Sequence, residues 1–132
     1  MITQAQEQNN VMIDSFQTFK SYASTKYDQV LRPQFHFTSK KNWINDPNGL
    51  VYYKGEYHMF FQHNPKSINW GNMTWGHAIS RDMIKWTQLP HAILPYGNGT
   101  IFSGTAVVDN INSLGENTEK YPTIIYWLLL AL

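Results

Sequence analysis

The sequence has no cysteine among its 132 residues, which excludes disulfide bonds and thiolate metal sites and leaves the redox compartment undetermined. It also has little net charge, because ten Lys and Arg stand against nine Asp and Glu, for a net charge of +1. A chain so close to neutral offers no strongly basic surface to nucleic acid or to an anionic membrane. We therefore expect neither as a partner.

Long apolar runs are scarce as well. Residues 1–30 contain no apolar signal-peptide core and no lysine-rich start, so no secretory signal is expected in this chain. The absence of such a signal favours a cytoplasmic location by default. The alternative is a secreted or periplasmic location, if the true N-terminus is missing from this sequence. The apolar run at residues 124–132 is too short for a membrane span, which needs about 20 residues. It suits a buried strand, an aggregation-prone tail or sequence foreign to the rest of the chain.

Aromatic residues are abundant, at 15% of the chain, and four of the five tryptophans lie between Trp43 and Trp86. Such clusters pack between stacked β-sheets or form platforms for sugar rings, and packing accounts for most of them. Hydrophobic residues make up 42% of the sequence, which is typical of a soluble globular chain. The length suits one domain.

The pattern along the chain predicts an all-β domain after a short extension. Residues 1–30 are polar, with a weak helical periodicity that predicts a short helix. From Arg32 onward, aromatic and β-branched runs alternate with Pro, Gly and Asn. Lys54 and Gly55 predict a tight hairpin. Four strands between Leu50 and Leu89 would make one propeller blade, and a strand at 101–108 would begin the next.

The segment from Asn45 to Gly49 contains the candidate catalytic residue. Asn, Asp, Pro and Gly are turn residues, and a plain loop is the simple interpretation. Pro47, however, pushes Asp46 toward an extended conformation, and Asn48 and Gly49 would then turn the chain into the strand at Leu50. The Asp46 carboxylate would thus be held on rigid backbone at the start of a strand. A nucleophile needs such a fixed orientation toward the atom that it attacks.

Several motifs, in order, closely resemble the start of glycoside hydrolase family 32, which contains invertases, levanases and exo-inulinases. The resemblance covers residues 32–109, at plausible spacing. It is carried by the segments Arg32 to Phe37, Asn42 to Leu50, Tyr57 to Pro65, Trp70 to Gly71, Trp75 to Ala78, Ser80 to Asp82, Trp86, and Phe102 to Asp109.

This resemblance implies the first blade and part of the second of a five-bladed β-propeller. The domain limits that follow are an N-terminal extension at 1–30, a partial family 32 propeller domain at 31–123, and a non-family apolar tail at 124–132, from truncation or frameshift. The implied activity is hydrolysis of terminal β-D-fructofuranosides, with levan, inulin or sucrose as substrate and no cofactor. Within the family, the amino-acid sequence from Trp70 to Trp75 is more similar to levanases and exo-inulinases than to invertases.

The resemblance also implies roles for individual residues. Asp46 matches the catalytic nucleophile, which would form a covalent fructosyl-enzyme and retain configuration. The remaining matches are substrate-binding residues. They are Asn45 and Gln62 as partners of fructose hydroxyls, Trp70 as a wall of the pocket, and Phe102 and Ser103 as sugar contacts from the second blade.

The second carboxyl group of such a site is missing from the sequence. A retaining glycosidase needs two, about 5 Å apart, and the family's Arg-Asp-Pro and Glu-Cys motifs are both absent. Arg81 and Asp82 precede Met83 and match a structural turn. We therefore expect an N-terminal fragment without the acid/base. The alternatives are a non-catalytic fructoside-binding module or a non-functional truncated product, and within the enzyme class a fructosyltransferase.

The five histidines do not suggest a metal site. His58 and His63 are five residues apart, which places them on opposite faces of a strand, and no His-Glu-x-x-His pattern occurs. The oligomeric state and the linkage preference stay open at this level.

Overall fold

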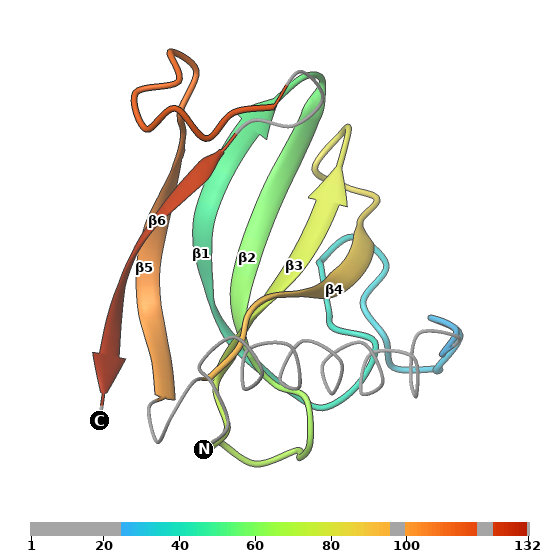
Figure 1. Cartoon of the computed structure of the whole chain (residues 1–132). Coiled ribbons are helices and arrows are strands. Elements are labelled where there is room, and N and C mark those ends of the chain that lie inside the picture. Colours follow the sequence, from blue (N-terminus) through green and yellow to red (C-terminus); the bar gives the residue numbers. More distant parts are fainter. Residues whose placement is uncertain (1–24, 96–99, 119–122, 132) are drawn as a thin grey trace.

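The computed structural model describes residues 25–95, 100–118 and 123–131, and every regular element in these ranges is a β-strand. The first sheet is an antiparallel meander in the order β1-β2-β3-β4, and β5 and β6 form a second sheet beside β1 (Figure 1). A four-stranded meander is the unit of a propeller blade. The strands are β1 (Trp43–Tyr53), β2 (Glu56–Asn64), β3 (Thr74–Ser80), β4 (Thr87–Ile93), β5 (Thr100–Val108) and β6 (Ile124–Ala131).

The predicted hairpin at Lys54 and Gly55 is confirmed. Tyr53 pairs with Glu56, and the two residues between them have φ of 45° and 88°. Positive φ at both positions is typical of the two-residue turn whose twist matches that of the flanking strands. The helix predicted within residues 1–30 falls mainly on residues 1–24, which lie outside the described ranges. Within those ranges no helix is long and apolar enough to cross a membrane.

The core lies between the two sheets. Phe60 and Trp75 of the first sheet and Ile101 of the second are all fully buried. Tyr126 of β6 meets the rings of Phe60 and Trp75 edge-on, with centroids 5.2 and 5.6 Å away. Burial of these apolar side chains is what fixes the second sheet against the first.

The apolar run near the C-terminal end forms β6, so the strand that was expected there is present. It pairs with β5 from Val108 and Ile124 at one end to Thr100 and Ala131 at the other. The run packs through Tyr126 onto the first sheet.

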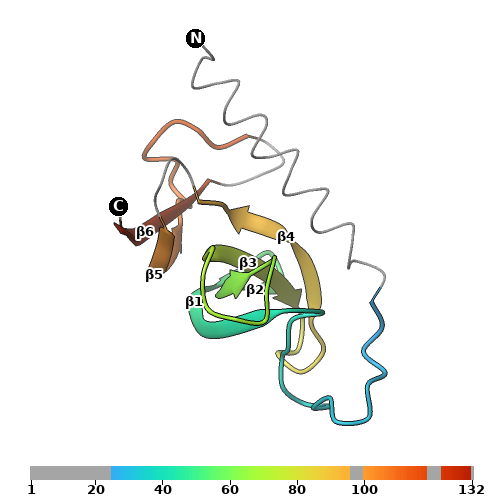
Figure 2. The same cartoon turned by 90° about the horizontal axis from the view of Figure 1, so that it is seen from below.

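The opposite face of the first sheet is covered by the segment that leads into β1 (Figure 2). Phe37 packs on Phe61 of β2, with ring centroids 4.8 Å apart. Arg32 holds this segment in shape by donating from its guanidinium to Thr38 Oγ1 and to the carbonyl of Ser39. Both faces of the first sheet are therefore covered, as the two-sided apolar pattern of β2 predicts.

Candidate active site

The predicted site residues gather at one end of the two sheets. β1 and β3 begin at this end and β2 finishes there, because neighbouring strands are antiparallel. β5 runs beside β1 in the same direction, since Ser103 bonds Asp46 and Gly104 bonds Asn48. Figure 1 shows this end at the bottom of the view. The topology alone therefore brings the start of β1, the end of β2 and the start of β5 together.

Asp46 lies on a β-bulge in β1. Ile44 pairs with His63 and Pro47 pairs with Phe61, so Asn45 and Asp46 together face the single residue Gln62. An extra residue of this kind bends the strand and re-aims its side chains, and bulges are frequent beside active sites. Pro47 is tolerated because β1 is at the edge of its sheet.

The structure corrects the expectation that residues 45–49 form a turn before the strand. β1 begins at Trp43 and already contains the whole segment. Asn48 pairs with Phe60 and Val51 with His58, so a second bulge falls at Gly49, whose φ is 50°. The turn-forming residues therefore interrupt the strand twice, and at Gly49 the second bulge uses the positive φ that a tight turn also needs.

A matching irregularity occurs in β5. Ile101 pairs with Leu130 and Gly104 with Leu128, so Phe102 and Ser103 share one partner position on β6. The carboxylate of Asp46 and the hydroxyl of Ser103 therefore both project from bulges, one on each sheet.

The two bulges bring Asp46 and Ser103 into direct contact. Ser103 Oγ donates a hydrogen bond of 2.7 Å to Asp46 Oδ2. Within β1, Trp43 Nε1 donates to Asn45 Oδ1 at 3.0 Å. Asp46 and Asn45 are both exposed. The Asp46 carboxylate is therefore accessible from solvent while the Ser103 hydroxyl bonds one of its oxygens.

The pKa of Asp46 lies below its ordinary value. The hydrogen bond from Ser103 is the largest cause, and partial desolvation opposes it while bonds from the backbone and from Asn45 add to it. Donors that bond the charged form of a carboxyl group favour that form. Asp46 is therefore an anion at neutral pH, as a carboxylate nucleophile must be.

The other predicted site residues differ in how far the structure connects them to Asp46. Gln62 is opposite Asp46 in the ladder and only 3% exposed, and its Oε1 and Nε2 have no hydrogen-bond partner among the described residues. Phe102 is 37% exposed next to Ser103. Trp70 lies in the loop between β2 and β3 and is 58% exposed, and no hydrogen bond joins it to Asp46 among the described residues.

Trp43 contacts one of the predicted site residues, although the sequence analysis gave it no role in the site. It is the first residue of β1 and its indole holds Asn45. A tryptophan two positions before a site residue on one strand lies on the same face as that residue, since side chains alternate with period two. That spacing was the available signal.

Among the described residues, the side-chain hydrogen bond that reaches the Asp46 carboxylate comes from the Ser103 hydroxyl, and no ion pair involves Asp46. Glu56 lies beside the hairpin turn, at the other end of β2 from Gln62, and its carboxylate pairs with the Arg81 guanidinium at 3.2 Å. Asp82 accepts hydrogen bonds from the backbone N–H groups of Ile84 and Lys85, so it shapes a turn, in agreement with its predicted structural role.

Four of the five histidines form two pairs on opposite faces of the first sheet. His58 Nδ1 lies 3.1 Å from His77 Nε2, on the face with Phe60. His63 Nδ1 lies 2.9 Å from His91 Nε2, on the face with Phe61. The described residues hold no group of three or more His, Cys, Asp or Glu side chains arranged to bind a metal ion.

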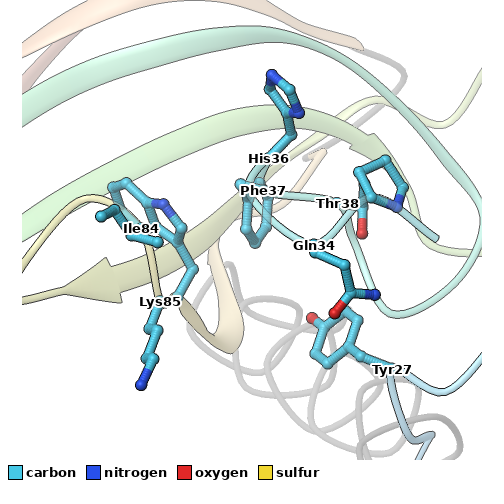
Figure 3. Close-up of a pocket in the computed structure, with 9 residues that line it drawn as sticks. Tyr27, Gln34, His36, Phe37, Thr38, Ile84 and Lys85 are labelled. Carbon is cyan, nitrogen blue, oxygen red and sulfur yellow. The ribbon is translucent and has the colours of Figure 1, made fainter.

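A pocket of about 220 Å³ lies away from Asp46, beneath the segment that leads into β1. Figure 3 shows Phe37 between Ile84 on one side and Gln34 with Tyr27 on the other. None of the predicted site residues lines this pocket. The predicted site residues therefore lie outside this pocket.

Comparison with known proteins gives close relatives with the same fold. The model of the glycosyl hydrolases family 32 N-terminal domain matches residues 36–128. A levanase of Bacillus subtilis strain 168 is 53% identical over 102 residues, which are 77% of this chain and 15% of the levanase. The crystal structure of exo-inulinase from Aspergillus awamori superposes with a TM-score of 0.71 at 46% identity, over 76% of this chain and 20% of that one.

A fructofuranosidase of Schwanniomyces occidentalis, solved in complex with fructose, also superposes with a TM-score of 0.71, at 38% identity over 81% of this chain and 22% of that one. Fold and relatives together define the class, which is that of β-propeller glycosidases. The chain belongs to glycoside hydrolase family 32. Its two sheets are the first blade and part of the second of the family's five-bladed propeller.

The chain spans between 15% and 19% of the length of the first curated relatives. The family match extends to residue 128, which is five residues into the run that the sequence reading set apart as a tail. The domain limits at residues 30 and 123 stay predictions.

Proposed function

We propose that this chain carries the nucleophile half of an active site that hydrolyses terminal β-D-fructofuranosides, of the levan, inulin or sucrose class, with retention of configuration. The observation that carries the proposal is the contact between Asp46 and Ser103. It holds an exposed carboxylate in its ionised form at the end of the blade where the other family-matched residues gather. The close relatives named levanase and exo-inulinase support the substrate class.

In the proposed reaction, an oxygen of Asp46 attacks the anomeric carbon of the fructosyl unit. The bond to the leaving alkoxide breaks, and the alkoxide takes a proton from a general acid. Water, deprotonated by the same group, then attacks the fructosyl ester and releases fructose and the Asp46 carboxylate. Two displacements at one carbon restore the original configuration.

Sugar binding is assigned to the residues around Asp46. The buried amide of Gln62 has no partner among the described residues, and a buried amide without a partner is costly unless a ligand satisfies it. The exposed ring of Trp70 offers a flat apolar face of the kind that sugar rings pack against. Asn45 and Phe102 flank the carboxylate from the two sheets.

The general acid is the part of the reaction for which the sequence offers no candidate. Glu56 is engaged with Arg81, and Glu116 lies in the exposed loop after β5. We therefore propose that turnover requires a polypeptide that also supplies this group. The second candidate, fructoside binding without turnover, is favoured by the single carboxylate in the described site.

The test places residues 36–128 in the matching segment of the Bacillus subtilis levanase and measures fructose release from levan, inulin and sucrose. Asp46→Asn keeps the shape of the side chain but removes the nucleophile, so turnover should fall by more than about a hundredfold. Rapid acid quenching followed by peptide mass spectrometry should find a fructosyl adduct on Asp46. Asp82→Asn is the matched control and should retain turnover.

The complementary measurement uses the 132-residue chain itself and titrates it with fructose. Binding without fructose release from any of the three substrates would favour the binding module for this chain. Turnover by the Asp46→Asn enzyme above about one hundredth of the parent value would contradict the nucleophile assignment.

A further inference from the structure

The loop between β2 and β3, at residues 65–73, carries Trp70 at the same end of the sheets as Asp46 (Figure 1). The Trp70 ring is exposed, so burial of the ring does not fix its position. Because the loop residues belong to no strand, no ladder of backbone hydrogen bonds fixes it either. The position of Trp70 therefore depends on the contacts that hold the backbone on either side of it.

Asn64 is the last residue of β2, and its side chain supports this loop from the inside. The residue is only 1% exposed. Its Nδ2 donates a hydrogen bond of 2.7 Å to the backbone carbonyl of Asn69, and its Oδ1 accepts one of 3.0 Å from the backbone N–H of Lys66. One buried amide thus joins the start of the loop to the residue directly before Trp70.

The residue directly after Trp70 also lies close to this amide. A Cβ atom built on Gly71 would be 3.8 Å from Asn64 Nδ2, which is an ordinary van der Waals distance. The backbone on both sides of Trp70 is therefore within reach of the Asn64 side chain, through a hydrogen bond on one side and through packing on the other.

Two bonds from the segment that leads into β1 hold the first part of the loop. Asn42 Nδ2 donates to the Pro65 carbonyl at 2.6 Å, and the backbone N–H of Trp43 donates to the Ser67 carbonyl at 3.0 Å. These bonds fix the loop where it leaves β2. Asn64 extends the support from there to the two residues that flank the exposed tryptophan.

The two partners also fix which way the Asn64 amide points. The Asn69 carbonyl can only accept, so it needs the amide NH₂, and the Lys66 N–H can only donate, so it needs the amide oxygen. A carboxylate in this position accepts at both oxygens and offers the Asn69 carbonyl no donor. A protonated carboxyl group has one O–H donor and one acceptor oxygen, so it can serve both partners again.

We propose that Asn64 is a positioning residue for Trp70, which it holds in place through the backbone of Asn69. The inference rests on the proposed function, in which the Trp70 ring packs against the fructosyl unit. Such a ring contacts the sugar in the ground state and in the transition state alike, so its displacement weakens binding of both. Loss of Asn64 therefore raises KM and changes kcat little, whereas loss of Asp46 removes turnover.

The first test follows the indole N–H signal of Trp70 by NMR in the full 132-residue chain, without substrate. Asn64→Ala removes both side-chain bonds, so the Trp70 signal should shift and broaden. The backbone amide of Lys66 should exchange with solvent roughly tenfold faster, because it loses its acceptor. The Trp70 signal is assigned by its disappearance in Trp70→Phe.

The matched control is Asn117, whose amide does the same work in the loop after β5. Its Nδ2 donates to the Asp109 carbonyl and its Oδ1 accepts from the Thr123 N–H, both at 2.6 Å. Asn117→Ala therefore removes an equivalent pair of bonds from a loop that contains no predicted site residue. The Trp70 signal should stay where it is in the parent chain.

The second test uses Asn64→Asp in the levanase hybrid, with sucrose as substrate. Near neutral pH, KM should rise roughly tenfold with kcat changed by less than about threefold. Burial raises the pKa of the introduced carboxyl group. As pH falls through that pKa, the ratio of the variant's KM to the parent's KM, both measured at the same pH, should return toward one. Asn117→Asp should keep the parent KM throughout.

An unchanged Trp70 signal in Asn64→Ala would overturn the positioning role, and so would a KM ratio for Asn64→Asp that stays raised at low pH. Where Asn64→Ala does not fold, Asn64→Asp takes its place in the NMR test, and its Trp70 signal should rejoin that of the parent on acidification. A displaced Trp70 signal with an unchanged KM would support the role of Asn64 and contradict the sugar contact that the proposed function assigns to Trp70.

Discussion

The indole Nε1 of Trp75 donates a hydrogen bond of 3.0 Å to the backbone carbonyl of Phe102. Trp75 is fully buried in the first sheet, and Phe102 belongs to the bulge of the second. The bond therefore ties the residue next to Ser103 to the core of the neighbouring sheet. This one hydrogen bond therefore links the packing of the core to the position of the bulge that contains Ser103.

Trp75→Phe should consequently destabilise the fold by roughly 2 to 4 kcal/mol, because it leaves the Phe102 carbonyl without its donor and a gap in the core. The measurement is urea unfolding followed by tyrosine fluorescence or circular dichroism. Trp86→Phe also loses an indole hydrogen bond, but an exposed one, and should cost less than about 1 kcal/mol. Equal losses in the two variants would argue against a special role for the Phe102 contact.

Trp70→Ala should weaken fructoside binding by roughly 1 to 3 kcal/mol, the scale expected for loss of a packed aromatic ring. Because the ring is 58% exposed, stability should change by no more than about 0.5 kcal/mol. Calorimetric titration of the levanase hybrid with fructose gives the first quantity and thermal unfolding the second. Ile68→Ala, in the same loop, is the control. A similar loss of affinity in both variants would show that the effect comes from a change in the loop and not from the Trp70 ring.

Gly76→Ala should destabilise the first sheet by at least about 1 to 3 kcal/mol, the cost of overpacking a filled core. A Cβ atom at this position would stand 2.3 Å from Cε2 of Phe61, whose ring is buried. Adding Phe61→Leu should recover part of the loss, because it removes the opposing ring edge. Gly55→Ala has open space around it but a φ of 88°, so its loss should not be rescued by Phe61→Leu.

Acidification should destabilise the protein through the two histidine pairs. Burial, and then the charge of the neighbouring histidine, lowers the pKa of His77 to about 4 and that of His91 to about 3. Both values lie below the ordinary value of about 6.5, so the unfolded chain binds the protons more readily. Their contribution to stability is thus complete above about pH 6.5 and is lost as pH falls toward 4 and then 3.

Within that window each histidine contributes a slope of at most about 1.4 kcal/mol per pH unit. Urea midpoints measured at about pH 7, 5.5 and 4.5 should decline steadily, and the decline should be shallower in His77→Asn. The exposed His36 provides the control, since His36→Asn should keep the parent slope. An identical slope in His77→Asn and the parent would show that other groups carry the acid sensitivity.

The sequence was sufficient for the strand order of the blade because its signals are local. The hairpin at Lys54 and Gly55, the strands between Leu50 and Leu89 and the strand predicted at 101–108 all follow from alternation and turn residues. The site was predictable only as a set of residues. Which of them touch depends on contacts such as the one between Asp46 and Ser103, which are 57 positions apart.

The bulges and the histidine pairs show why the rest was out of reach. A turn and a bulge use the same residues, so Asn48 and Gly49 could not reveal that the strand continues through them. His58 and His77 are joined by cross-strand register, which depends on the pairing of β2 with β3. Strand register is set by tertiary packing as well as by the local sequence.

The division of the site between two sheets has a consequence for biosynthesis. A nascent chain can close the first hairpin locally, but the Asp46 carboxylate acquires its partner only when β5 has emerged and docked beside β1. Contacts of such long sequence separation form late and slowly. The Asp46 carboxylate therefore gains its Ser103 hydrogen bond only when the two sheets have come together, and until β5 docks it lacks that donor.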